Sequence, residues 1–569
     1  MADGTDPYAH GTASCLNCQG LTVIQSTFKS NYAFNAGAIY VVSSTAGVSI
    51  HNSTFRGNAA ESGGGAIIAM HTPVLISGCS FTDEKVETFG AWGGAVNIWS
   101  ATALTIEDTT FKGCYVASAG GAVRVFNSSA LLTNITCSSC RADTYGGCLA
   151  LTFSNVTVRD SRFDSNSCDF IGGAIHVDRA SALYAYNSTF NNNTALYGGA
   201  INGQEPDGLV EMYGCTLTGN SASDKGGAVH VESDAFTFRA ADTLFVENTV
   251  DELGGAVACT AANCSFVSCV LANNSAKLGG GVWSSSAKLL ALQMADIFGN
   301  KADHGGAIYA EAGTTVNLQS ARIHNNTAAA DGGGLALLSA QHAVISGSSV
   351  QHNQAVVGAG ILLLATPLLV LSGSNVTSNQ ARPRGSQASA VLADGTVAAA
   401  GSGGGFWAVQ SALQLQGSSI ANNTAVAGAG AYLSMCDVAL ADSELTGNKA
   451  QPGNGGALHA NMGSSNAINA TNTMFAANTA SSGGAVFVTG ASTGSSGYGT
   501  FNCADCTFTS NAAAQSGGAV MATGSMRLKL SSSKGANNAA AAGDGGALLC
   551  LGRCAQPCMQ CIKQLHTVA

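Results

Sequence analysis

Cysteines near the two ends of this sequence are the residues best suited to chemistry. Cys15 and Cys18 form a Cys-x-x-Cys motif, and a second group follows near the other end, at Cys550, Cys554, Cys558 and Cys561. Thiols at such spacings form disulfides or hold a zinc ion as thiolates. We expect a disulfide-bonded cap at each end, with a four-thiolate zinc site in the second group as the alternative, and we predict no cofactor.

Acidic and histidine residues could serve polysaccharide cleavage, which needs two carboxylates facing each other across the substrate. Glu107-Asp108 and Asp251-Glu252 are sequence neighbours in or near expected strands, so one member of each pair points away from the other. Asp303-His304 and Arg322-Ile323-His324 resemble fragments of such sites but fall at variable outward or turn positions. We therefore predict no catalytic residues, and an enzyme remains the alternative reading.

An internal repeat must position all of these residues. Its consensus is Gly-Gly-Ala-Ile/Val-x-Val, then a variable gap, then Leu-x-Ile-x-x-Ser-x-Phe-x-x-Asn. Successive starts are 25 to 29 residues apart, except for gaps of 45 after residue 358 and 34 after residue 483. The starts are residues 36, 64, 93, 120, 146, 172, 198, 226, 254, 279, 305, 332, 358, 403, 428, 455, 483, 517 and 545.

Apolar residues within each repeat alternate with a period of two, as in Val229 and Val231, which indicates strands. A unit this thin buries its apolar face only by stacking on its neighbours. The sequence therefore predicts an all-β protein, a single-stranded parallel β-helix of about 19 coils. At a spacing of about 4.8 Å per coil, the rod would be roughly 90 Å long.

Two recurrent residue types are predicted to form the turns. The Gly-Gly pairs supply positive φ where a Cβ would clash, as at Gly172, Gly173, Gly198, Gly199, Gly226, Gly227, Gly483 and Gly484. The asparagines are expected at positions that tolerate the left-handed conformation, with amides stacked between coils, as at Asn166, Asn193, Asn478 and Asn511.

The remaining cysteines follow the repeat. Four of them, Cys79, Cys215, Cys269 and Cys506, take the small interior position that is usually serine, so we expect buried small residues there. Another group falls on adjacent coils, where bridges could form: Cys114, Cys137, Cys140, Cys148 and Cys168.

The paired motifs at Gly172 to Ile175 with Phe190 to Asn193, and at Gly483 to Val486 with Phe508 to Asn511, resemble the GGAI and FxxN repeats of chlamydial polymorphic outer membrane proteins. The resemblance covers nearly the whole chain. It implies a right-handed β-helix displayed at a cell surface and commonly acting in adhesion. The chain departs from the family pattern by ending in a cysteine-rich tail.

Composition fits one solenoid. We divide it into an N-terminal cap (1–20), the β-helix (21–549) and a C-terminal cap or tail (550–569), with a flexible loop leaving the coil at 380–402. The net charge of −10 argues against nucleic acid as a partner. The uncharged run from Ala355 to Leu371 keeps the repeat register, so we read it as two strands and predict no transmembrane segment.

The compartment signals disagree with one another. The start Met1 to Pro7 is not a signal peptide. Nineteen cysteines nevertheless favour an oxidising, extracellular or cell-surface location. Twelve Asn-x-Ser/Thr sequons suggest a glycoprotein, although a repeat rich in these residues also makes sequons by chance; among them are Asn52, Asn127, Asn134, Asn155, Asn187, Asn263, Asn375 and Asn469.

The residue after the Ile or Val of each Gly-Gly turn should face outward, because its neighbours face inward. In the second half of the chain this column is aromatic, and we predict an exposed binding strip at Trp283, Tyr309, Trp407, Tyr432, His459 and Phe487. The simpler explanation is that aromatics favour sheets. We expect a non-enzymatic adhesive or matrix-forming protein that binds surface or matrix glycans or proteins, with self-association along the rod as a further option.

Overall fold

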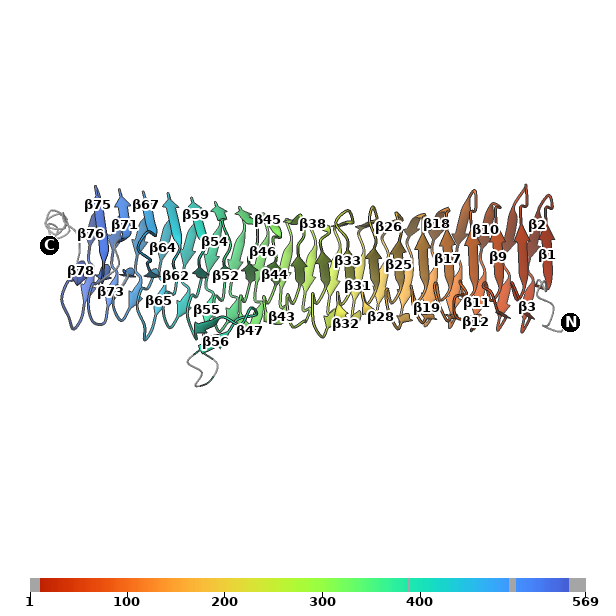
Figure 1. Cartoon of the computed structure of the whole chain (residues 1–569), viewed down its shortest axis with the longest axis horizontal. Helices are drawn as coiled ribbons and strands as arrows, with labels where there is room; N and C mark the ends of the chain where they lie inside the picture. The colour runs from red at the N-terminus through yellow and green to blue at the C-terminus, as the bar shows by residue number, and fades with distance from the viewer. Residues whose placement is uncertain (1–10, 384, 386–388, 491–497, 552–569) are drawn as a thin grey trace. The chain divides into compact units, whose positions relative to one another are not determined.

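A computed structural model describes residues 11–383, 385, 389–490 and 498–551. Short parallel strands make up these residues, among which no helix occurs. The chain divides into two compact units, Met1–Ala276 and Lys277–Ala569. Each is a stack of coils in which like strands lie side by side (Figure 1), and together they hold about 20 coils. The predicted all-β parallel β-helix is confirmed.

One coil contains up to four strands. In a representative coil these are β25 (Ile175–Asp178), β26 (Ala182–Tyr186), β27 (Thr189–Asn191) and β28 (Thr194–Tyr197). Each pairs in parallel with its equivalent one coil away, so that β25 pairs with β29 (Ile201–Gln204) in register Ile175↔Ile201. Like strands therefore build four sheets along each unit, and the Gly-Gly turn lies between the fourth strand of one coil and the first strand of the next.

The first sheet carries the residues that follow the Gly-Gly turns. In the N-terminal unit its other strands are β1 (Ala13–Leu16), β5 (Ile39–Val42), β9 (Ile67–Met70), β13 (Val96–Trp99), β17 (Val123–Phe126), β21 (Leu149–Thr152), β33 (Val229–Glu232) and β37 (Val257–Thr260). In the C-terminal unit they are β40 (Val282–Ser285), β44 (Ile308–Glu311), β48 (Leu335–Leu338), β52 (Ile361–Leu364), β58 (Phe406–Val409), β62 (Ala431–Ser434), β66 (Leu458–Asn461), β70 (Val486–Thr489), β74 (Val520–Thr523) and β78 (Leu548–Leu551).

The limits of the stack differ from the predicted domain boundaries. Strand β1 already pairs with β5, so the coils begin inside the segment 1–20 that was expected to be a cap. At the other end β78 still pairs with β74 and reaches the first residues of the expected tail, 550–569. Apolar residues spaced by two carry the coils into both segments.

Columns of apolar side chains fill the inside of each unit. Val229 and Val257 are register partners on adjacent coils, as the repeat predicts, and both are fully buried. In the third sheet Phe55 stacks on Phe81 with ring centroids 4.6 Å apart, and Phe81 stacks on Phe111 at 4.9 Å. Burial of each such side chain contributes about 1.5–3 kcal/mol.

The predicted asparagine stacks are present. Asn193 Oδ1 accepts the backbone N–H and the Nδ2 of Asn166 on the previous coil, both at 3.0 Å. The equivalent contacts between Asn478 and Asn511 are also 3.0 Å. These asparagines do not have positive φ, in contrast to our expectation. The residue before each one does, such as Asn192 at 53°, because the chain turns there and leaves the buried amide free to bond between coils.

The two glycines of each turn have different roles. Gly172 has a φ of 70°, as predicted, which favours glycine. A Cβ on Gly173 would instead collide with the carbonyl oxygen of Gly199 on the next coil. The first glycine makes the turn, and the second allows the coils to approach each other closely. The pairs at Gly198, Gly199, Gly226, Gly227, Gly483 and Gly484 behave in the same way.

The cysteines partly follow the predictions. Cys79, Cys215 and Cys269 are buried free thiols, as expected for a small interior position. Cys506 is an exception, because it forms a disulfide with Cys503 in the neighbouring strand. Among the cysteines expected on adjacent coils, Cys137 bonds to Cys148, whereas Cys114, Cys140 and Cys168 are free. Further disulfides join Cys15 to Cys18 and Cys259 to Cys264.

The described part of the long interruption after residue 379 contains strands, although a flexible loop was expected there. It keeps the coil through β55 (Gln380–Ala381) and then forms an antiparallel hairpin of β56 (Ser389–Val391) and β57 (Val397–Ala399). The apolar run before it contains β52 and β53 (Leu369–Ser372), which confirms strands there. Across the described ranges, the structure holds no helix long and apolar enough to cross a membrane.

Candidate binding groove

Two columns of side chains flank every Gly-Gly turn on the outer surface. The front column is the outward residue of each first-sheet strand, such as His176, and the rear column is the residue just before each Gly-Gly pair, such as Tyr145. Gly146, which follows Tyr145, lies so close to the next coil that a Cβ there would be 3.2 Å from the backbone nitrogen of His176. The Tyr145 and His176 rings consequently stack, 5.1 Å apart. We call the strip of surface that carries the two columns the groove.

The predicted exposed strip is wrong for three of its six residues. Trp283, Tyr309 and Trp407 are buried, with at most 5% of each residue exposed. The glycine of the turn packs directly on the front column. A Cβ on Gly305 would lie 2.7 Å from the Cβ of Tyr309, and a Cβ on Gly403 would lie 2.7 Å from the Cβ of Trp407. An outward direction in the strand is therefore not the same as contact with solvent.

The other three predicted residues form a half-exposed stack. The Tyr432 and His459 rings lie 4.9 Å apart at 22°, and the His459 and Phe487 rings lie 5.0 Å apart at 37°. They stay partly open because the rear column here consists of small residues, Ala427, Asn454 and Ser482. Burial lowers the pKa of His459, which keeps its ring neutral at physiological pH. The structure thus brings Tyr432, His459 and Phe487 into one apolar surface.

Farther toward the N-terminus of the same unit, the groove holds a buried acid and a histidine. His304 Nδ1 lies 2.6 Å from Oδ2 of the fully buried Asp331, and both residues belong to the rear column. Burial raises the pKa of Asp331, while the hydrogen bond from His304 opposes this rise. Hairpin residues Ala393 and Asp394 also act on Asp331, the former through a backbone hydrogen bond and the latter through its charge. The hairpin therefore covers this part of the groove.

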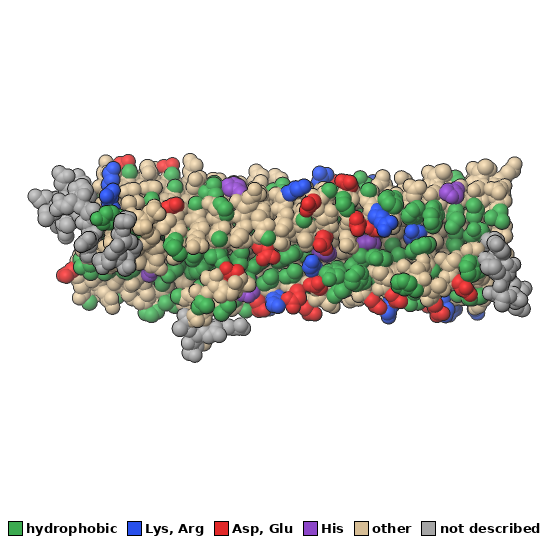
Figure 2. All heavy atoms as spheres, in the orientation of Figure 1, with side chains coloured by type: hydrophobic (Ala, Val, Ile, Leu, Met, Phe, Trp, Pro, Cys, Tyr) green, Lys and Arg blue, Asp and Glu red, His purple; other side chains and the backbone are tan. Residues whose placement is uncertain are grey.

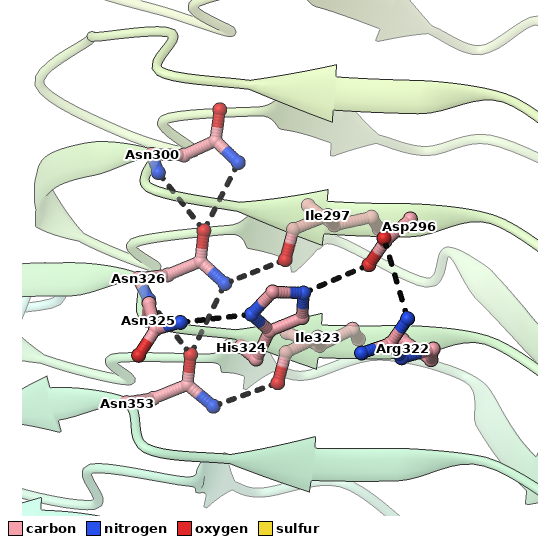
Figure 3. A network of polar contacts seen from close by, with 9 residues as sticks. All are labelled: Asp296, Ile297, Asn300, Arg322, Ile323, His324, Asn325, Asn326 and Asn353. Carbon is pink, nitrogen blue, oxygen red and sulfur yellow. Dashed lines mark hydrogen bonds and ion pairs between the residues drawn. The ribbon is translucent and has the colours of Figure 1, made fainter.

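A second histidine and acid pair lies on the outer face of the third sheet (Figure 3), on strands β42 (Asp296–Phe298) and β46 (Arg322–His324). His324 Nε2 lies 2.9 Å from Asp296 Oδ1, and Asn325 Nδ2 lies 2.9 Å from His324 Nδ1. The imidazole thus donates to the carboxylate and accepts from the amide. Both ring nitrogens are occupied, so this histidine has no nitrogen left to take a proton from a substrate.

Within the residues that the structure describes, no group of three or more His, Cys, Asp or Glu side chains is placed to hold a metal ion. Cys550 takes part in a disulfide. Cys554, Cys558 and Cys561 lie outside the described residues, so the predicted C-terminal cap and its zinc alternative stay predictions.

Comparison with known proteins gives one clear result. The family model described as "Right handed beta helix region" matches residues 11–240 and 291–479. The metabotropic glutamate receptor-like protein R of Dictyostelium discoideum is 28% identical over 137 residues, which are 24% of this chain and 8% of that protein. No solved structure matches the chain significantly.

Proposed function

Since this chain belongs to the family of right-handed β-helix proteins, we propose that it is a non-enzymatic protein of the cell surface or the extracellular matrix, with an adhesive or matrix-forming role. Its partners are glycans or proteins held along the groove. Its repeats are of the type found in chlamydial polymorphic outer membrane proteins, a proposal supported by the recurrent GGAI and FxxN motifs.

The half-exposed stack of Tyr432, His459 and Phe487 carries this proposal. Its rings are held in line by the coil register, since Tyr432 pairs with His459 and His459 with Phe487 on successive coils. Asn461 Nδ2 donates to the Tyr432 hydroxyl at 2.9 Å, which fixes that ring further. A rigid row of aromatic faces suits sugar rings or apolar side chains, because little entropy is lost when a ligand packs on it.

Replacing Tyr432 and Phe487 together with serine tests the proposal. We expect binding to glycan-bearing cell surfaces to fall at least tenfold, while the far-UV circular dichroism spectrum stays the same, because neither ring belongs to the interior columns. The matched control is Tyr213→Ser, which removes an exposed tyrosine from the second sheet of the N-terminal unit. Unchanged binding of the double variant would remove this surface from consideration.

The alternative function is a polysaccharide lyase or hydrolase of the same fold. His324 has both ring nitrogens engaged, which argues against its acting as a base, whereas His304 is held by Asp331 through Nδ1 and is the residue to test for catalysis. A reducing-sugar and an unsaturated-product assay over a panel of polysaccharides discriminates the two functions. We expect no turnover, and turnover that is lost in His304→Gln would establish the enzyme instead.

The exposure of the sequon asparagines supports the proposed extracellular location. Seven of the eight sequon asparagines named above are exposed, and Asn263 is half-buried. Disulfides such as Cys137–Cys148 are also typical of oxidising compartments. We expect the protein isolated from its source organism to lose mass when N-glycans are removed enzymatically. A mass that equals the bare polypeptide before treatment would contradict this location.

A further inference from the structure

The groove of the N-terminal unit contains a cavity of about 220 Å³ beside β17 and β21. The rear column contributes Trp92 and Tyr145, the front column contributes Arg124 and His176, and Phe126 and Thr152 close the side. Figure 2 shows hydrophobic side chains gathered with basic ones over this part of the first sheet.

Arg124 is the unusual member of this lining. Only 6% of the residue is exposed, and its Nη1 is buried without a hydrogen-bond partner. Its guanidinium carbon lies 4.5 Å from the centre of the Trp92 ring and 4.9 Å from that of Phe126. These rings stabilise the charge but accept no hydrogen bond in the plane of the guanidinium. A desolvated N–H of this kind normally has an acceptor.

The carboxylate in the cavity wall is not that acceptor. Asp178 lies 3.5 Å from Arg179 Nε and pairs with that exposed residue. Burial lowers the pKa of Arg124 to about 10, so the side chain remains charged at neutral pH. Asn97, the register partner of Arg124, also has a buried Oδ1 without a partner, and the two side chains do not bond to each other. Arg124 therefore lines the cavity as a charged group whose Nη1 has no acceptor within the protein.

Apart from the paired Asp178 and Arg179, the lining next to Arg124 is aromatic or small and carries no charge. His176 Nδ1 bonds to Asn202 Oδ1 at 3.1 Å, and burial lowers the pKa of the histidine to about 4, so its ring is neutral at pH 7. Tyr145 lies over this ring and is itself 38% exposed. Aromatic faces next to a cation suit a ring that carries both an apolar face and an anionic group.

We propose that this cavity binds one sugar ring that bears a carboxylate or a sulfate, with the anion on Arg124 and the ring against Tyr145. The proposal rests on the glycan-binding function above and specifies its ligand as an acidic glycan. The volume suits a single ring rather than a drug-sized ligand. An acidic peptide could also place a carboxylate on Arg124 but offers no flat ring, so it is the competing occupant.

Calorimetric titration of the full chain with small probes tests this site. Glucuronate and glucose 6-sulfate are expected to bind at least tenfold more tightly than glucose, acetate, inorganic sulfate and an acidic dipeptide. Arg124→Met keeps the aliphatic contacts and should weaken the binding of both acidic sugars at least tenfold. The control Arg239→Met removes an exposed arginine of the second sheet and should leave binding unchanged.

A second variant keeps the test decisive if Arg124→Met fails to fold. Thr152→Trp fills the cavity without removing the arginine and should abolish binding of both acidic sugars. Full binding by either folded variant would overturn the proposal. The proposal would also be overturned if acetate or inorganic sulfate bound as tightly as the acidic sugars, or if the acidic dipeptide bound more tightly than they do. The Tyr432 and Phe487 variants lie in the other unit, so failure of the proposed function and failure of this site are distinguishable.

Discussion

Glu84 interrupts the asparagine stack of the N-terminal unit. It is fully buried at the place where other coils have asparagine, and its two oxygens accept the backbone N–H and the Nδ2 of Asn58 at 3.1 and 3.2 Å. Cys114 and Cys140 take the next two places, and the stack resumes when Cys140 N–H donates to Asn166 Oδ1 at 3.0 Å. Burial raises the pKa of Glu84 from 4.5 to about 8, so the fold favours a neutral carboxyl here.

Glu84 should therefore make stability depend on pH. The contribution of Glu84 to the free energy of unfolding is fully present below about pH 4.5 and is lost as pH rises toward 8. The reason is that this carboxyl ionises at a lower pH in the unfolded chain than in the folded one. The loss amounts to about 4 kcal/mol at pH 8. Glu84→Gln keeps the shape and cannot ionise, so its thermal unfolding midpoint should fall less between pH 5 and pH 8.

The control for this prediction is Glu87→Gln, an exposed acid of the same coil. It should retain the wild-type dependence on pH. Parallel midpoint curves for wild type and Glu84→Gln would show that the buried carboxyl does not titrate in this range.

Residue patterns predicted the stacked amides because asparagine recurs at one place in the repeat. They could not identify which residue adopts positive φ. Asn192 and Asn193 are both asparagines, and both tolerate that conformation. Only the packed coil distinguishes them, since the interior has space for one amide and the bend falls on its neighbour.

At the scale of elements, the hairpin of β56 and β57 is a segment of the chain that covers its own groove. Leu392 in its turn is buried, and Asp394 lies near enough to raise the pKa of both Asp331 and Tyr309. Burial works to lower the pKa of His304, but Asp331 outweighs it and the pKa is raised overall. A protonated His304 offsets the buried acid under the hairpin.

The hairpin should consequently loosen as pH rises. Because the folded pKa of His304 is raised, its stabilising contribution is complete below about pH 6.5 and is lost as pH rises through the higher folded value. Hydrogen exchange of residues 389–399, corrected for intrinsic rates, should be at least fivefold faster at pH 8.5 than at pH 6. His304→Gln should exchange fast at both values.

His342→Gln, on the second sheet of the same unit, is the matched control and should behave like wild type. Equal corrected exchange at the two pH values in wild type would contradict the coupling between His304 and the hairpin.

The sequence did contain a signal for this hairpin. Asp394-Gly395 separates two short apolar runs, which is the usual pattern of a tight β-turn, and Gly395 has a φ of 86°. This turn pattern is hard to recognise in the sequence, because the insertion interrupts the repeat at this point. Its docking site could not be predicted, because Asp331 lies more than two coils earlier and belongs to the rear column, which has no consensus residue.

At the scale of the whole molecule, the repeat predicted the fold and the coil register but not the exposure of the front column. Alternation assigns a direction to each side chain, and that assignment was correct. Exposure depends on the residue before the glycines, which varies from Trp92 and Tyr145 to Ser482. Trp92 and Tyr145 pack on Arg124 and His176, whereas the small residues beside Tyr432, His459 and Phe487 leave that stack half-open. The cavity beside Arg124 was missed for the same reason. Trp407 departs from this trend, because it is buried although Ser402 precedes its turn.

Hydroxyl-radical footprinting of the free chain, and of the chain with chondroitin sulfate as an acidic glycan probe, tests the groove most directly. In the free chain we expect Tyr432 and Phe487 to be oxidised. Trp283 and Trp407 are buried, so we expect them to react at least tenfold more slowly than solvent-exposed tryptophans would. With the glycan, oxidation of Tyr432, Phe487 and Tyr145 should fall, while the exposed Tyr213 stays unchanged. Ready oxidation of Trp283 and Trp407, or protection of Tyr213 alone, would contradict a groove between the two columns as the binding surface.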